Sequence, residues 1–173
     1  MSRPESSLSS DAPPREPLRF TDLIARCLDS VEEIFPWDLA ERLADSGATP
    51  LLLDIREPYE FEAMHIAGSI NVPRGILETA CDYGYEETVP ELVAARERPI
   101  VVICRSGNRS VLAAHVMQLM GYRSLCSLKT GLKGWNDFEQ PLIDAAGSTV
   151  DVDDADEYFT PRLRPEQLGP KRD

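Results

Sequence analysis

The chain has 173 residues, which is enough for one well-buried domain with tails and short for two. Hydrophobic residues make up 42% of it and charged residues 28%, as in water-soluble globular proteins, and its longest apolar runs are far shorter than a membrane span. The formal net charge of −12 argues against general nucleic-acid binding, which needs a basic surface. With no apolar signal segment in the first 20 residues, we expect a cytoplasmic protein.

Short apolar runs alternate along the chain with stretches whose apolar residues recur at helical spacing. The apolar runs predict strands over 31–34, 51–54, 69–72, 100–104 and 125–128. The helical spacing predicts helices over 20–31, 36–47, 58–64, 110–120 and 132–138, with a weakly patterned helical region over 74–96. This alternation predicts an α/β fold of three layers, in which helices flank a mainly parallel, five-stranded central sheet.

Composition divides the chain into four parts. Residues 1–18 are rich in Ser and Pro, which predicts a disordered tail, and residues 19–30 predict an extra N-terminal helix. The alternating pattern fills residues 31–143 and predicts the domain itself. Residues 144–173 are acidic and contain several prolines, which predicts a C-terminal tail.

Charge is spread unevenly along the domain. Residues 96–134 hold seven basic residues and one acid, whereas residues 136–160 hold eight acids and no base. The basic stretch surrounds Cys104. A local positive field inside an acidic protein suits a small anionic substrate better than a polyanion.

The chain has four cysteines, Cys27, Cys81, Cys104 and Cys126, and none of them belongs to a C-x-x-C pair. With only two histidines in addition, the spacing of a metal site is absent, and we expect neither a metal nor another cofactor. In a reducing compartment the default state is four free thiols. A redox relay between Cys104 and either Cys81 or Cys126 is an alternative.

Cys104 lies where the apolar run 100–104 ends and the polar loop RSGNR begins. The first N–H groups of the following helix have no partner inside it, and with the loop amides they can form an anion cradle. Gly107 allows the tight turn that such a loop needs. These dipoles, together with the guanidinium groups of Arg105 and Arg109, favour a thiolate over a thiol. The loop therefore predicts a reactive Cys104.

Three motifs resemble those of rhodanese-like sulfurtransferase domains and occur in that family's order. LLLDIREPYEFEAMHIAGSINVP resembles the strand-turn-helix signature, CRSGNRS the active-site loop and LKTGLKGWNDFEQPL the closing segment. The resemblance covers about residues 30–142. One departure is Thr130-Gly131, where family members often carry a Gly-Gly pair.

The resemblance implies a sulfurtransferase that needs no cofactor. Cys104 would accept a sulfane sulfur as a persulfide from a small anionic sulfur donor, either thiosulfate or a persulfide, and pass it to cyanide, a thiol or a protein thiol. Asp54 and Arg56 would brace the loop. The substrate-binding residues implied by the resemblance are Arg105, Ser106, Gly107, Asn108, Arg109 and Ser110.

Two other functions remain open. Cysteine-dependent phosphatases and some arsenate reductases use a similar strand-loop-helix site, but with five residues between Cys and Arg. Here four residues separate Cys104 from Arg109, which narrows the cradle. The second alternative is a rhodanese-like interaction or sulfur-carrier module, although non-catalytic modules of this kind usually lack the cysteine.

Overall fold

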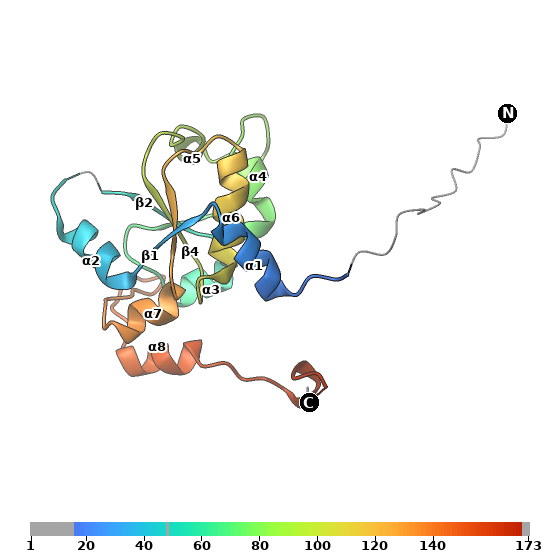
Figure 1. Ribbon diagram of the computed structural model, residues 1–173. Helices are drawn as coiled ribbons and strands as arrows, with labels where there is room; N and C mark the ends of the chain where they lie inside the picture. The colour runs from blue at the N-terminus through green and yellow to red at the C-terminus, as the bar shows by residue number, and fades with distance from the viewer. Residues whose placement is uncertain (1–15, 48, 171–173) are drawn as a thin grey trace.

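The structure, a computed structural model, describes residues 16–47 and 49–170. A parallel sheet runs through its middle (Figure 1). Its five strands are in the order β1-β5-β4-β2-β3. The strands are β1 (Glu32–Ile34), β2 (Leu51–Asp54), β3 (Ile70–Asn71), β4 (Ile100–Ile103) and β5 (Leu125–Leu128). Each lies within a predicted strand, and the predicted α/β fold with a five-stranded parallel sheet is confirmed.

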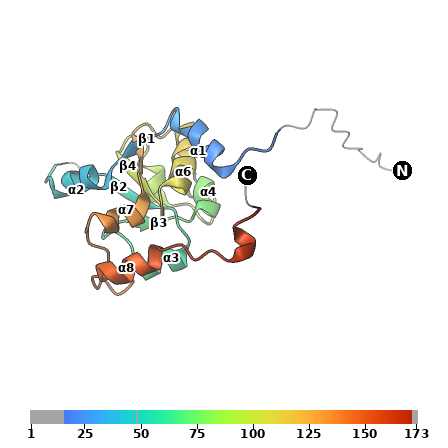
Figure 2. The same cartoon turned by 60° about the horizontal axis from the view of Figure 1, so that its bottom comes forward.

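Helices cover both faces of the sheet, which gives the three layers (Figures 1 and 2). Helices α1, α4, α5 and α6 contribute to the core on one face, whereas α2, α7 and α8 contribute to the core on the other. The α-helices of the described residues are α1 (Phe20–Leu28), α2 (Pro36–Ala44), α3 (Pro58–Ala63), α4 (Leu77–Ala80), α5 (Pro90–Val93), α6 (Asn108–Leu119), α7 (Gly131–Asp137) and α8 (Val152–Phe159). Two short 3-10 helices are η1 (Arg74–Ile76) and η2 (Pro165–Gln167).

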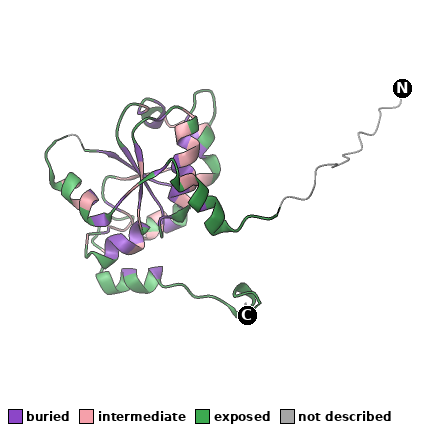
Figure 3. Ribbon diagram, in the orientation of Figure 1, coloured by how far each residue is buried: buried purple, intermediate pink, exposed green. Residues whose placement is uncertain are grey.

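Strand β4 is buried along its whole length, as its apolar sequence predicts. Because side chains alternate between the two faces of a strand, Ile100 and Val102 join the core under α6, while Val101 and Ile103 join the core under α7. Figure 3 shows the resulting pattern, in which the buried residues follow the sheet and the helix faces turned toward it. The next side chain in this alternation, Cys104, belongs to the α6 side.

The predicted N-terminal helix is present as α1, which packs against α6 through the buried Ile24. The disordered tail that the sequence predicts over 1–18 falls mostly on residues 1–15, which lie outside the described residues. Among the described residues, no helix has both the length and the apolar character needed to span a membrane.

The acidic C-terminal segment is more than the tail that its composition suggests. It contains α8, whose Ala155 and Phe159 are buried in the core next to α7. Asp151 caps this helix by accepting a hydrogen bond from the Asp153 N–H at 2.9 Å, and Asn136 Nδ2 donates to the Val152 carbonyl at 3.0 Å. Residues 151–159 are therefore a folded part of the domain.

The turn before α7 contains a strained position. Thr130 has a φ of 64°, a left-handed conformation that a β-branched residue rarely adopts. Its side chain fills the space beside Gly134, where an added Cβ would overlap the Thr130 hydroxyl. Apart from Thr130, the nearest atom to such a Cβ is Pro36 Cγ, at an ordinary contact distance of 3.6 Å. Thr130 thus makes glycine necessary at position 134.

We expect Gly134→Ala alone to lower the free energy of unfolding by about 1–3 kcal/mol, because the new methyl group overpacks against Thr130. In a Thr130→Gly background the same change should be neutral or stabilising, because the clash is gone and alanine favours a helix. Urea unfolding of the two single variants and the double variant measures this coupling. Strictly additive effects would contradict the contact.

Candidate functional site

The predicted site residues meet at one edge of the sheet, where the parallel strands end. Asp54 is the last residue of β2, and Cys104 follows directly after β4, the neighbouring strand. This carboxyl-terminal edge is where open α/β sheets bind ligands. The loop after Cys104 turns at Gly107, whose φ is 88°, and α6 begins at Asn108, two residues before the predicted start at Ser110.

The sulfur of Cys104 is surrounded by hydrogen-bond donors. Its side chain is 1% exposed. The N–H groups of Gly107 and Ser110 donate to Sγ at 3.1 and 3.4 Å, and the Ser110 hydroxyl lies 3.2 Å from it. Such donors stabilise negative charge on sulfur.

Not every loop residue reaches the sulfur. Ser106 and Asn108 are exposed. Within the part of the chain that the structure describes, the amides of Ser106, Asn108 and Arg109 make no hydrogen bond to Sγ. The groups next to Sγ are therefore two amides and one hydroxyl.

A second buried serine extends the polar chain away from Cys104. The Ser127 hydroxyl on β5 lies 2.7 Å from that of Ser110, and both side chains are fully buried. Ser127 is absent from the residues predicted from the sequence. The available signal is a polar residue at a position of the apolar run LCSL whose side chain faces α6.

The first residues of α7 bind the backbone of the cysteine loop. The N–H groups of Leu132 and Lys133 donate to the carbonyls of Cys104 and Arg105, each at 3.0 Å. A Cβ at Gly131 would come within 2.5 Å of the Cys104 carbonyl oxygen, and one at Gly107 within 2.8 Å of the Thr130 nitrogen. The closing segment and the cysteine loop therefore pack backbone against backbone. This contact explains why the site needs glycine at both positions.

Arg109 is bound by a carboxylate of the protein itself. Its Nη1 and Nη2 donate to Glu60 Oε2 and Oε1 at 2.9 and 2.8 Å. Burial by itself raises the pKa of Glu60, but the hydrogen bonds from Arg109 and from the Glu57 N–H outweigh it and lower the pKa below its ordinary value. The same pair, through the hydrogen bond to Glu60, raises the pKa of Arg109. Glu60 is a further residue absent from the predicted site.

Glu60 is positioned by Arg56, which is completely buried. Arg56 Nη2 donates to Asp54 Oδ2 at 2.7 Å, and its Nε lies 3.0 and 3.1 Å from the two Asp54 oxygens. The guanidinium also donates to the backbone carbonyls of Glu60 and Met64 at 3.1 and 2.7 Å, at the end of α3. Asp54 and Arg56 thus brace α3 directly and reach the cysteine loop through Glu60 and Arg109.

Arg105 contacts the C-terminal segment. Its Nη2 donates to the carbonyl of Phe159, the last residue of α8, at 2.6 Å. Tyr158, one residue earlier, lies among charges of the site. Burial and then the Glu60 carboxylate raise the pKa of this tyrosine, while Arg56 and Arg105 act in the opposite direction. Figure 2 shows α8 next to α7 and α3, so the C-terminal helix borders the site.

The other cysteines do not form a relay with Cys104. Cys126 belongs to the core on the α7 side of the sheet, whereas Cys104 belongs to the core on the α6 side. Cys81 is fully buried beside Tyr122, which precedes β5 at the opposite edge of the sheet. All four cysteines are free thiols. Among the described residues, no cluster of His, Cys, Asp and Glu is placed to hold a metal ion.

One large hollow formed by the described residues is remote from Cys104. It has a volume of about 940 Å³ and lies between α2 and the amino-terminal ends of the strands, with Glu41, Pro99 and Cys126 among its lining residues. None of the predicted site residues lines it. The candidate active site is therefore identified by its position around Cys104 and not by the volume of a hollow.

We expect Glu60→Gln to lower the free energy of unfolding at pH 7 by about 1–3 kcal/mol, because Arg109 loses its ionic partner in a half-buried position. Since folding lowers the pKa of Glu60, its stabilising effect is present above the ordinary glutamate pKa and disappears as the pH falls through the lowered value. The two proteins should therefore converge in stability on acidification, as measured by urea unfolding between pH 7 and pH 3. Glu62→Gln, on the exposed side of α3, is the control; an equal effect there would contradict a specific role for Glu60.

We expect Ser110→Ala to slow alkylation of Cys104 by iodoacetamide at neutral pH by about tenfold, because a hydrogen bond to charged sulfur is worth about 1.5–3 kcal/mol. Ser127→Ala should have a smaller effect in the same direction, since it acts through Ser110. Peptide mass spectrometry measures the reaction at Cys104 alone. The exposed Ser106→Ala variant should match wild type, and equal slowing in all three variants would refute the hydrogen-bond chain.

The chain is similar to known proteins in both sequence and structure. The family model described as rhodanese-like domain matches residues 36–138. Adenylyltransferase and sulfurtransferase MOCS3 of Drosophila virilis is 38% identical over 86 residues, which are 49% of this chain and 18% of that protein. The putative sulfur carrier protein YrkF of Bacillus subtilis is 33% identical over 91 residues, 53% of this chain and 44% of that protein. The chain thus spans less than half the length of these curated relatives.

A solved structure of similar fold has a different description. It is RPA3614 of Rhodopseudomonas palustris, a protein of unknown function described as a possible tyrosine phosphatase. The two chains share 26% identity with a TM-score of 0.65, over 75% of this chain and 98% of that one. With the family model covering more than half of its residues, this chain belongs to the rhodanese-like domain family.

Proposed function

We propose that the chain is a sulfurtransferase in which Cys104 carries a sulfane sulfur as a persulfide. The observation that carries the proposal is the environment of Sγ at the end of β4, where it accepts hydrogen bonds from the Gly107 and Ser110 amides and lies beside the Ser110 hydroxyl. Membership of the rhodanese-like family and the sulfurtransferase and sulfur-carrier relatives support it.

The chemistry follows from a thiolate at that position. The Cys104 thiolate attacks the outer sulfur of the donor, an Sγ–S bond forms, and the donor's S–S bond breaks. With thiosulfate the leaving group is sulfite; with a persulfide it is the carrier thiolate, and in each case it departs with the bonding electron pair. A second nucleophile, either cyanide or a thiol, then takes the sulfur and regenerates Cys104. This is a ping-pong covalent mechanism that needs no cofactor.

The remaining loop residues have binding roles in this proposal. The amides of Gly107 and Ser110 stabilise the negative charge on Sγ before the attack and again when the thiolate is regenerated. Arg105 and Arg109 line the loop on either side of Ser106 and Asn108, and an anionic donor would contact these side chains. Asp54 and Arg56 support the loop through α3 and do not contact the donor.

The partners are then a sulfane-sulfur donor and a thiol, which can belong to a protein, as acceptor. Four free cysteines with one required as a thiolate suit a reducing compartment, and we place the reaction in the cytoplasm. The domain that carries it comprises residues 31–143 with α1 in front, and α8 extends it on the C-terminal side.

A phosphatase is the second candidate, favoured by the similarity to RPA3614. Three features make it the weaker one. Four residues separate Cys104 from Arg109, and only two amides reach Sγ among the described residues, whereas a phosphoryl group needs several donors at once. Moreover, both terminal nitrogens of Arg109 are bound to Glu60.

We expect incubation with thiosulfate or a thiol persulfide to add one sulfur atom to the wild-type chain and none to Cys104→Ser, as measured by intact mass. Cys126→Ser, which removes a half-buried thiol on the other face of the sheet, is the matched control and should load like wild type. Addition of cyanide should remove the sulfur as thiocyanate. No loading from any donor would refute sulfur transfer, and Cys104-dependent hydrolysis of an aryl phosphate would establish the phosphatase instead.

A further inference from the structure

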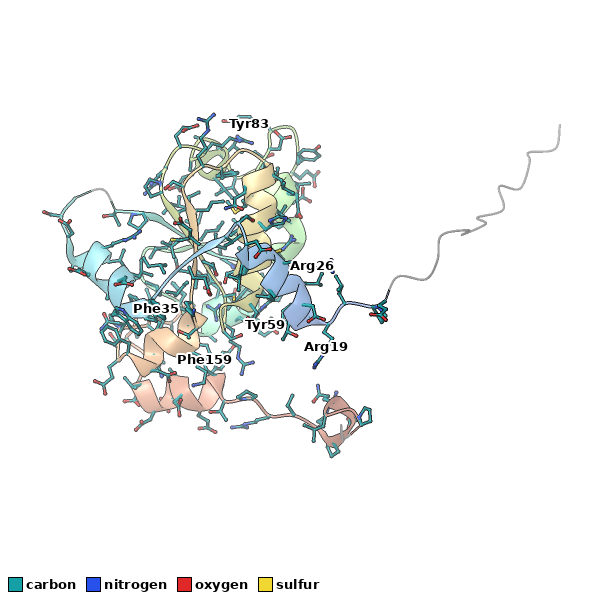
Figure 4. All side chains as sticks on the ribbon, in the orientation of Figure 1. Arg19, Arg26, Phe35, Tyr59, Tyr83 and Phe159 are labelled. Carbon is teal, nitrogen blue, oxygen red and sulfur yellow. The ribbon has the colours of Figure 1, made fainter. Side chains whose placement is uncertain are left out.

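Helix α8 forms one side of the candidate site and is held there at both ends. Asn136 Nδ2 binds the carbonyl of Val152 at its start, and Arg105 Nη2 binds the carbonyl of Phe159 at its end. Between them, Ala155 and Phe159 are buried against α7. Figure 2 shows α8 beside α3, and Figure 4 shows Phe159 of α8 and Tyr59 of α3 on the same side of the molecule.

This arrangement engages both arginines beside Cys104. Arg109 is paired with the Glu60 carboxylate. Arg105 binds a carbonyl at the C-terminal end of a helix, which carries partial negative charge. A doubly charged anion that needs both guanidinium groups must therefore compete with two acceptors that the protein already supplies.

The negative charge of α8 also disfavours a doubly charged anion. Residues 151–159 contain five acids and no base. A groove of about 500 Å³ runs beside the helix, lined by Asp154, Glu157, Tyr158, Thr160 and Arg162, and the single cation among these, Arg162, is paired with Glu157 at 2.6 Å. Tyr158 connects the groove to the site, because it lines the groove and directly precedes Phe159, whose carbonyl accepts the hydrogen bond from Arg105 Nη2. A donor that approaches along α8 thus meets a surface of net negative charge.

We propose that α8 selects the sulfur donor by charge, so that the site accepts the persulfide of a neutral or cationic carrier and disfavours dianions such as thiosulfate. This rests on the proposed function and specifies its donor class. In the step concerned, the Cys104 thiolate attacks the outer sulfur of R–S–SH and the Sγ–S bond forms. The carrier leaves as R–S⁻ with the electron pair of the broken S–S bond, and the proton stays on the transferred sulfur. The carrier group R lies in the groove beside α8.

A series of persulfides with one skeleton tests this directly on the full chain. The 2-aminoethyl, 2-hydroxyethyl and 2-sulfonatoethyl persulfides react through the same S–S bond and differ in carrier charge. We expect loading rates, followed by intact mass, to fall in that order by about tenfold overall, with thiosulfate slower than the hydroxyethyl compound. Higher ionic strength should compress the differences, because salt screens exposed charges. Equal rates along the series would overturn the proposal.

Paired variants locate the selectivity. Asp154→Asn/Glu157→Gln removes two charges from the α8 groove, and Glu86→Gln/Glu87→Gln removes two from the connection between α4 and α5. Tyr83 on that connection lies at the far end of the molecule from Phe159 (Figure 4). We expect the first variant to narrow the spread of rates several-fold and the second to leave it unchanged.

The outcomes separate the two proposals. Equal narrowing in both variants, or none in either, would remove α8 as the selecting element while sulfur transfer through Cys104 stands. If no donor in the series loads Cys104, sulfur transfer itself is refuted, and donor selection with it. The result that supports donor selection has two parts: the wild-type chain loads the donors at rates in the predicted order, and the spread of these rates narrows several-fold in the α8 variant but not in the Glu86→Gln/Glu87→Gln variant.

Discussion

A buried positive charge organises the candidate site. Arg56 is completely inaccessible to solvent, and a charge in that position is costly unless it is paired and all its donors are used. Asp54 neutralises it, and the carbonyls of Glu60 and Met64 accept its remaining hydrogen bonds. These bonds attach the end of α3 to the end of β2. The position of Glu60, and through it that of Arg109, depends on this attachment.

The side chains of the site are consequently held by more hydrogen bonds within the protein than exposed cations on a loop would be. Cys104 is held by amides and a hydroxyl on the α6 side and by the start of α7 on the other. Each arginine beside it has an acceptor within the chain, a carboxylate for Arg109 and a helix-terminal carbonyl for Arg105. Rigid positions of this kind reduce the reorganisation needed when charge moves onto sulfur, and they also reduce the positive charge available to a substrate.

Most of the fold could be predicted because its elements have strong local signals. The run from Ile100 to Ile103 is apolar throughout, a pattern typical of a strand that is buried on both faces. Gly121 is a helix-stop signal, and α6 ends two residues before it, at Leu119. Helix α8 gave no such signal. Only Ala155 and Phe159 face the core, among acids that composition alone assigns to solvent, so its helical state depends on the surface that α7 offers. The family itself was also predictable, since its motifs are contiguous in sequence.

The sequence by itself determined the α/β architecture, the family, and a thiol at the junction of a strand, a polar loop and a helix, because each of these depends on residues close together in the chain. Only the tertiary structure decided which side chains meet there. Glu60 reaches Arg109 from another helix, Ser127 reaches Ser110 from a neighbouring strand, and the Phe159 carbonyl reaches Arg105 across 54 positions. The tertiary structure likewise places Cys126 and Cys104 on opposite faces of the sheet. Periodicity determines which face of an element is buried, but hydrogen-bond partners from distant segments are chosen by packing, which no local pattern records.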